Sequence, residues 1–126
     1  MTRPVLVLVT LQRACARLID SGAELARPDG CTLHVLHVLA KSQAKEQTLD
    51  AKTLDYLYAL ATEKGAEMCV RIAEVPVTAI ANYAQEINAG KVVMGGGEKA
   101  SGIAETLSSL LPGVQVLIMD SEVSPV

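Results

Sequence analysis

The sequence predicts a single α/β domain over residues 1–126: an open five-stranded parallel sheet, Rossmann-like, in the order 3-2-1-4-5 with helices on both faces. Three observations lead to this fold class. A chain of 126 residues fits one domain, since domains commonly hold about 100–200 residues. Hydrophobic residues make up 50% and charged residues 20%, which provides a core and excludes a disordered chain. Apolar runs alternate with helical patterns from end to end, and strict alternation favours a parallel sheet joined by right-handed crossovers.

The first part of the chain predicts a strand, a helix and a second strand. Residues 5–9 read Val-Leu-Val-Leu-Val, a continuous apolar run that is typical of a strand covered on both faces. Over residues 11–26 the apolar positions recur at helical spacing, and Pro28-Asp29-Gly30 ends that helix. Residues 31–39 return to a strand pattern, and a polar loop is expected at 41–47.

The rest of the chain repeats this alternation. Leu54, Leu57 and Ala61 mark a second helix, and Gly65 is expected to cap its C-terminus. Ser101 is expected to cap a short fourth helix. The remaining elements are a polar strand near a sheet edge at 68–73, a helix at 77–87, a strand at 91–94, a helix at 103–110 and a last strand at 114–119.

Composition and charge exclude several classes of protein. The net charge is −3 and no block of like charge occurs, so neither nucleic acid nor an anionic membrane is expected as a partner. No apolar stretch approaches transmembrane length, so no membrane insertion is expected. The cysteines at 15, 31 and 69 are scattered and odd in number, as in proteins of a reducing cytoplasm, where we expect this one to act.

Ligands of such sheets bind outside the carboxyl ends of the strands, where the strand order reverses. The triple glycine at residues 95–97 follows a predicted strand there, and glycines before a helix let backbone N–H groups approach a phosphate. Lys99 and the Ser101 hydroxyl could assist. The P-loop pattern is not met, because Ile103-Ala104 stand where Lys-Ser/Thr is required, and Glu98 would repel phosphates. A turn that binds no ligand is the alternative.

Other polar residues give weaker signals. Thr10 follows the first strand and could bond a ribose or base, or cap the next helix, which is the role we favour. His34 and His37 have opposite parity on one strand, so they cannot bind one metal together, and each is expected to be a packed, hydrogen-bonded side chain. No metal site and no catalytic constellation emerges.

Taken together, the residues resemble the universal stress protein family over essentially the whole chain. Four segments carry the resemblance: the strand at 5–9, the strand at 33–38, Glu74-Val75-Pro76 and Val92-Val93-Met94-Gly95. The sequence looks closest to the stress-protein-like domain of bacterial potassium-transport sensor kinases and its free-standing relatives. The segments that indicate that branch are 54–58, 65–68 and 110–114.

The resemblance also carries a nucleotide pattern: Gly-x-x-Gly, nine residues, then Gly-Ser/Thr. Counted from Gly95, the first glycine is kept, the second falls on Glu98, and the final pair falls on Ser108-Ser109, which keeps only the hydroxyl residue. Thr10 stands where ATP-binding members carry an acidic residue. If a nucleotide binds, the resemblance places its phosphates against Gly95, Gly96, Gly97, Ser101 and Ser109, and its adenosine near Thr10 and Val38.

Two functions follow as expectations from the resemblance. The first is a non-catalytic, dimeric regulatory module in bacterial stress or ion-homeostasis signalling, with a degenerate nucleotide loop, no bound cofactor and a protein partner. The alternative is a stress protein that binds ATP or another adenine nucleotide, such as a cyclic dinucleotide, with at most slow hydrolysis. The family resemblance implies a homodimer through the last strand, residues 114–119, whose apolar edge would otherwise be exposed.

Overall fold

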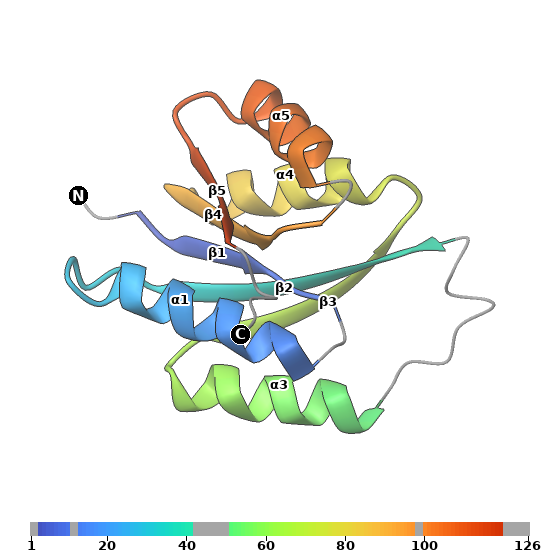
Figure 1. The fold of residues 1–126 in the computed structure, drawn as a ribbon. Coiled ribbons are helices and arrows are strands. Elements are labelled where there is room, and N and C mark those ends of the chain that lie inside the picture. The colour runs from blue at the N-terminus through green and yellow to red at the C-terminus, as the bar shows by residue number, and fades with distance from the viewer. Residues whose placement is uncertain (1–2, 11–12, 42–50, 98–99, 120–126) are drawn as a thin grey trace.

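The fold is an open twisted sheet between two layers of helices (Figure 1), as the computed structural model shows for residues 3–10, 13–41, 51–97 and 100–119. Residues 42–47 of the loop predicted at 41–47, the start of the first helix at Leu11, and Glu98 and Lys99 lie outside this range. In chain order the elements are β1 (Val5–Leu8), a 3-10 turn η1 (Arg13–Cys15), α1 (Ala16–Ala26), β2 (Leu33–Ala40), α3 (Ala51–Glu63), β3 (Glu67–Ala73), α4 (Pro76–Glu86), β4 (Lys91–Gly95), α5 (Ala100–Leu110) and β5 (Gln115–Met119).

The strand order confirms the predicted topology. The sheet runs β3-β2-β1-β4-β5 and every neighbouring pair is parallel. β1 is central, with Leu6 opposite His34 of β2 and Val92 of β4. The chain builds outward from β1 first on one side and then on the other, so the strand order reverses between β1 and β4. A binding site is expected outside the carboxyl ends of these two strands.

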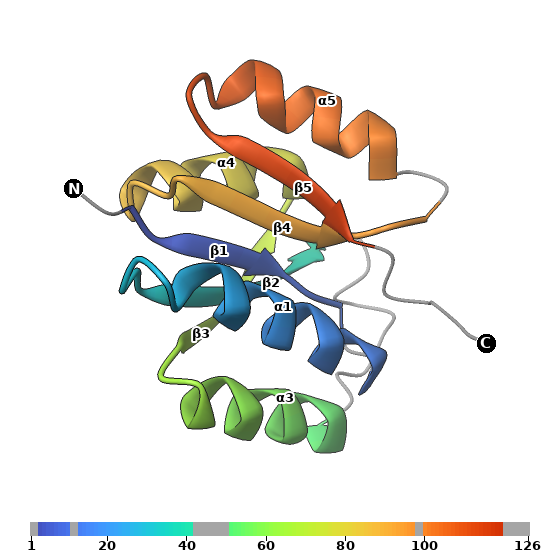
Figure 2. The same ribbon diagram turned by 60° about the vertical axis from the view of Figure 1, so that its left-hand side comes forward.

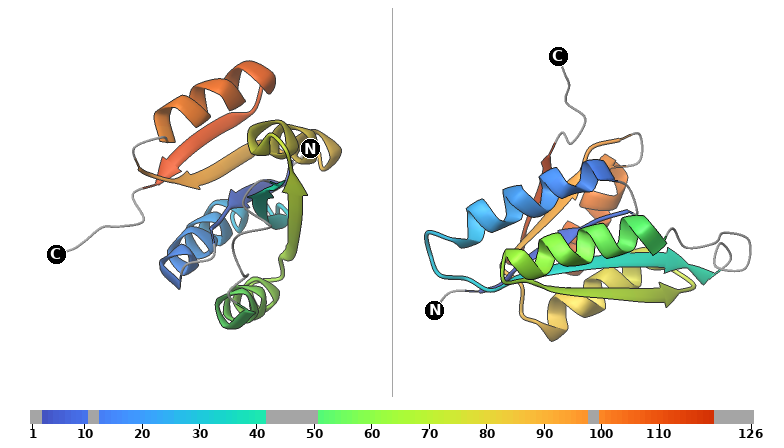
Figure 3. Two further views of the ribbon diagram at one scale, coloured as in Figure 1. Left: turned by 90° about the vertical axis from the view of Figure 1, so that its right-hand side faces the viewer. Right: turned by 90° about the horizontal axis from the view of Figure 1, so that it is seen from below.

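Helices cover both faces of the sheet, as Figures 2 and 3 show: α1 and α3 on one face, α4 and α5 on the other. Alternate residues of β1 therefore enter different cores. Val5 and Val7 pack with Ile19 and Leu57 beneath α1 and α3. Leu6 packs on the opposite face with a cluster that includes Leu107 of α5. This two-sided burial explains why the central strands are continuous apolar runs.

A glycine lets α1 lie close to the sheet. Gly22 falls on the apolar side of the helix, and a Cβ built there would clash with Val7 Cγ2 and lie 3.1 Å from Leu33 Cδ1. Gly65, the expected C-terminal cap residue, follows α3 and has a φ of 76°. This left-handed backbone conformation favours glycine. The two positions use glycine for different reasons, close approach and left-handed backbone.

Arg3 holds the amino ends of the strands together. Its guanidinium donates to the carbonyl oxygens of Ala89 at 2.8 Å, Gly113 at 3.2 Å and Asn88 at 3.4 Å. These carbonyls belong to the loops that enter β4 and β5. One side chain thus joins the first residues of the chain to two later connections.

Candidate functional site

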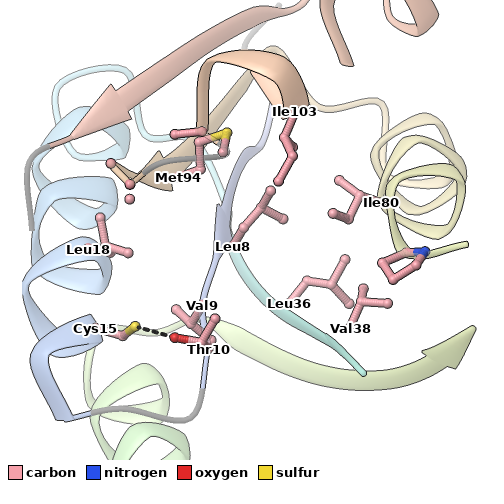
Figure 4. A pocket seen from close by; sticks show the side chains of 15 residues that line it. Leu8, Val9, Thr10, Cys15, Leu18, Leu36, Val38, Ile80, Met94 and Ile103 are labelled. Atoms are coloured by element: carbon pink, nitrogen blue, oxygen red, sulfur yellow. Dashed lines mark hydrogen bonds between the residues drawn. The ribbon is translucent and has the colours of Figure 1, made fainter. Parts of the chain in front are cut away.

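A pocket of about 400 Å³ lies at the carboxyl ends of β1, β2 and β4, where the strand order reverses (Figure 4). Its volume falls in the range of roughly 300–1,000 Å³ that is common for small-molecule sites. Figure 4 shows Leu18 of α1 on one side, Ile80 of α4 on the other, and Ile103 of α5 at the top of the view. The pocket is therefore formed by three strands and three helices that are far apart in the sequence.

The lining is mainly apolar. Its apolar residues are Leu8, Val9, Leu18, Leu36, Val38, Pro76, Ile80, Met94, Ala100 and Ile103. The polar groups are the Thr10 hydroxyl, the Cys15 thiol and the backbone of residues 95–97. None of the lining residues that the structure describes is Asp, Glu, Lys, Arg or His. Such a surface suits a flat, mostly apolar ligand that a few hydrogen bonds orient.

The structure brings together five of the seven expected site residues. Thr10, Val38, Gly95, Gly96 and Gly97 line the pocket. The other two, Ser101 and Ser109, are exposed residues of α5 and are not among the lining residues. Because α5 begins at Ala100, Ser109 lies about 14 Å further along the helix axis. The spacing of the nucleotide pattern therefore does not bring Ser109 to the glycines.

Two expected helix caps are not present as such. Thr10 does not cap α1, because the N-cap position is Cys15 and no side chain bonds to the helix start there. Instead, the Thr10 hydroxyl lies 3.5 Å from Cys15 Sγ, across the 3-10 turn that precedes α1. Ser101 lies inside the first turn of α5. The Thr10 hydroxyl consequently remains at the pocket, where it can meet a ligand.

The glycine turn has less need of glycine than its sequence indicates. Among the described residues the glycines with positive φ are Gly30, Gly65 and Gly113, so residues 96 and 97 have ordinary backbone. A Cβ on Gly97 would meet no described atom within 4 Å, and one on Gly96 would make only normal contacts with Met119 and Ile118. The free protein could therefore hold larger residues here.

Part of the turn is already committed to the sheet. The Gly96 N–H donates to the Met119 carbonyl at 2.8 Å, which extends the pairing of β4 and β5 by one bond. The Ala100 N–H donates to the Gly97 carbonyl at 3.1 Å. These two donors are not available to a phosphate unless the bonds break.

Sequence reasoning missed most of the lining, including Leu8, Pro76, Ile80 and Ile103. Each of these residues is apolar and stands at a position that also fits ordinary core packing. No periodic signal distinguishes an apolar pocket wall from a core, so only the position of the strand ends pointed here.

Both histidines are packed and hydrogen-bonded, which confirms the prediction. His37 is buried, and its Nδ1 lies 2.9 Å from the Val9 carbonyl oxygen. His34 Nδ1 lies 3.3 Å from the Tyr83 hydroxyl, on the α4 face of the sheet. Among the described residues no group of three or more His, Cys, Asp or Glu side chains could hold a metal ion.

A small polar cluster joins β3 to α4 on that same face. The Arg71 guanidinium lies 4.7 Å from the centre of the Tyr83 ring and donates to Glu86 Oε2 at 2.9 Å. The hydrogen bond from Arg71 lowers the pKa of Glu86, and burial raises the pKa of Tyr83. The cluster lies outside the pocket lining and fixes α4 on the sheet edge.

The Arg71–Glu86 pair gives a prediction for acid stability. Because the folded-state pKa of Glu86 is lowered, its contribution is present above its ordinary pKa and is lost as the pH falls through the lowered value. Glu86→Gln should therefore melt below the parent protein at pH 7, and the difference should shrink as the pH falls below the ordinary pKa of glutamate and through the lowered pKa of Glu86. Thermal melts across this range at constant salt measure it. A difference that grows toward low pH would contradict the assignment.

The sequence model of the Universal stress protein family matches residues 1–109. The chain belongs to the universal stress protein family. No curated protein gives a significant match to it. None of the helices in the described part of this universal stress protein is long and apolar enough to cross a membrane.

Solved universal stress proteins share the fold. One in complex with cAMP has a TM-score of 0.69 at 17% identity, with 95% of this chain and 98% of that chain covered. One from Archaeoglobus fulgidus in complex with dAMP has a TM-score of 0.64 at 24% identity, with coverage of 93% and 97%. One from Arabidopsis thaliana with AMP bound has a TM-score of 0.61 at 14% identity, with coverage of 94% and 91%.

Proposed function

We propose that this universal stress protein is a non-catalytic regulatory module that binds an adenine nucleotide in the pocket at the ends of β1, β2 and β4. One observation carries the proposal: two of the glycines at this pocket, Gly96 and Gly97, serve no need of the backbone or of packing among the described residues. A glycine that the fold does not require costs stability, because it adds freedom to the unfolded chain. Close approach of a ligand to the backbone gives it a reason.

The rest of the pocket supports the same ligand class. An adenine ring is flat and largely apolar on its faces, and the walls supplied by Leu8, Ile80 and Ile103 match it. Solved members of the family are described in complex with cAMP, dAMP and AMP. The described lining has no carboxylate, histidine or lysine that could act as a general acid or base, which favours sensing over catalysis.

Gly97→Ala tests the proposal, because stability and binding should change in opposite directions. Without ligand, the free energy of unfolding of the variant should rise by up to about 1 kcal/mol, because the backbone at residue 97 accepts alanine. AMP at about a hundred times its dissociation constant should stabilise the parent by about 2.7 kcal/mol. This corresponds to a rise of about 10 °C in the melting temperature, Tm. In Gly97→Ala that rise should shrink, because the new methyl group occupies the line of approach.

Gly102→Ala is the matched control, an exposed glycine of α5 that does not line the pocket. It should keep the full AMP response. If the parent shows no shift with AMP, cAMP or MgATP, the chain is a scaffold without a nucleotide, which was the first expectation from the sequence. An equal AMP response in Gly97→Ala and the parent would place the ligand elsewhere.

We further propose that the module is a homodimer through β5, and that it acts through a protein partner in bacterial stress or ion-homeostasis signalling. β5 is an edge strand that pairs only with β4 among the described strands. Ile118 on it is 44% exposed. An exposed apolar edge of this kind can pair with a second chain, and a second copy covers it symmetrically.

Ile118→Lys is expected to weaken dimerisation at least about a hundredfold, because edge lysines oppose strand pairing. Sedimentation velocity over a range of concentrations measures the change. Tyr58→Lys makes the same kind of exposed apolar-to-lysine change on α3, away from β5, and should leave the dimer intact. A parent protein that stays monomeric at all concentrations would refute the interface.

A further inference from the structure

Resting on the proposed function, we infer that the pocket selects an adenine nucleoside or monophosphate of low charge, with or without a ribose diol, and discriminates against nucleoside triphosphates. The argument has two parts: the charge that the site can tolerate, and the sugar groups that it can recognise.

The first part concerns charge. No described residue that lines the pocket has a cationic side chain, so no described side chain there neutralises a polyphosphate. The N-terminal end of α5 carries a partial charge of about +0.5, enough to favour one phosphate group but not three.

Backbone donors at the turn are limited as well. The N–H of Gly96 is bonded to the Met119 carbonyl, and that of Ala100 to the Gly97 carbonyl. A triphosphate cradle requires several free N–H groups that converge on the ligand. Breaking these bonds to supply them would offset part of what the added phosphates gain.

The second part concerns the sugar. Nucleotide sites that require a ribose diol place a carboxylate on it, which accepts from the hydroxyl groups. Here the only described hydroxyl-bearing side chain at the pocket is Thr10, and it lies 3.5 Å from Cys15 Sγ. A hydrogen bond between two neutral hydroxyl groups contributes little net free energy, so loss of one sugar hydroxyl should cost less than about tenfold in affinity.

The test is calorimetric titration of the intact chain with adenosine, 2′-deoxyadenosine, AMP and ATP, the last without divalent metal so that it keeps its full charge. We expect adenosine and 2′-deoxyadenosine to bind within about tenfold of each other, as one hydrogen bond allows. We also expect AMP to bind more tightly than metal-free ATP. A larger preference for adenosine, or metal-free ATP binding as tightly as AMP, overturns this inference and leaves the proposed function standing. If none of the four binds at millimolar concentrations, the proposed function itself fails.

Two substitutions at Thr10 locate the sugar. Thr10→Val removes the hydroxyl and should bring the affinities for adenosine and 2′-deoxyadenosine within about twofold of each other. Thr10→Asp supplies a carboxylate and should raise the preference for adenosine above about tenfold. Thr10 is exposed, so both variants are expected to fold, and the parent-like Tm of each without ligand checks this. An unchanged preference in Thr10→Asp would show that the sugar does not lie at Thr10.

Discussion

Replacing Leu107 by alanine is expected to destabilise the protein by about 3–4 kcal/mol, within the range measured for buried leucines in well-packed cores. Leu107 is 0% exposed and packs from α5 against a cluster that includes Leu6 and Val92 of the sheet. The substitution removes the transfer free energy of the side chain and leaves a cavity that its neighbours can only partly fill. The stability of a domain totals only about 5–15 kcal/mol, so this loss is a large share.

Urea denaturation should show the effect as a lower midpoint at an unchanged slope, because the surface exposed on unfolding stays nearly the same. Leu110→Ala is the matched control: the same change on the same helix, at a residue that is 43% exposed. It should cost less than about 1 kcal/mol, as surface substitutions generally do. Equal losses at both positions would mean that α5 is not seated as described.

Gly22→Ala should destabilise the protein by about 2–3 kcal/mol, although alanine is the better helix former. The new methyl group would clash with Val7, which lies on the central strand and is completely buried. Because that strand is held by β2 and β4, α1 must move away, and its contacts with the first core weaken. The Tm should fall by about 8–12 °C for a domain of this size.

The control is again a glycine-to-alanine change in a helix. A Cβ on Gly102 would meet no described atom within 4 Å, so Gly102→Ala should raise the stability by up to about 1 kcal/mol. If alanine lowers the stability at Gly22 and raises it at Gly102, the effect at Gly22 comes from steric conflict and not from helix propensity. A Gly22→Ala protein that melts at or above the parent Tm would contradict the close packing of α1 on β1.

Fold and site differ in how far the sequence determines them. The five strands and their order were predictable because apolar runs and helical spacing alternate without a break, and parallel sheets obey strict connection rules. The places where glycine is needed were partly predictable: Gly65 caps α3, whereas the triple glycine at 95–97 predicts a turn that approaches a phosphate and has ordinary backbone at 96 and 97.

The site itself was visible only in outline. Its position follows from topology, since the carboxyl ends of β1 and β4 meet where the strand order reverses. Its walls could not be predicted, because an apolar side chain in a pocket and one in a core have the same pattern in sequence. Ser109 shows the limit of motif spacing: a count of residues gives no distance until one knows that a helix starts at Ala100.

The hydrogen bonds of Arg3 have a consequence for how this protein can change over evolution. At the amino ends of the strands the connections are cross-braced by the protein's own groups, with three carbonyls satisfied by one guanidinium. Thr10 follows the other end of β1, seven residues after Arg3. A fully extended chain of that length would place the two residues about 23 Å apart. Substitutions that far apart generally act additively on stability. Ligand preference can therefore drift at one rim of the sheet while the opposite rim preserves the scaffold.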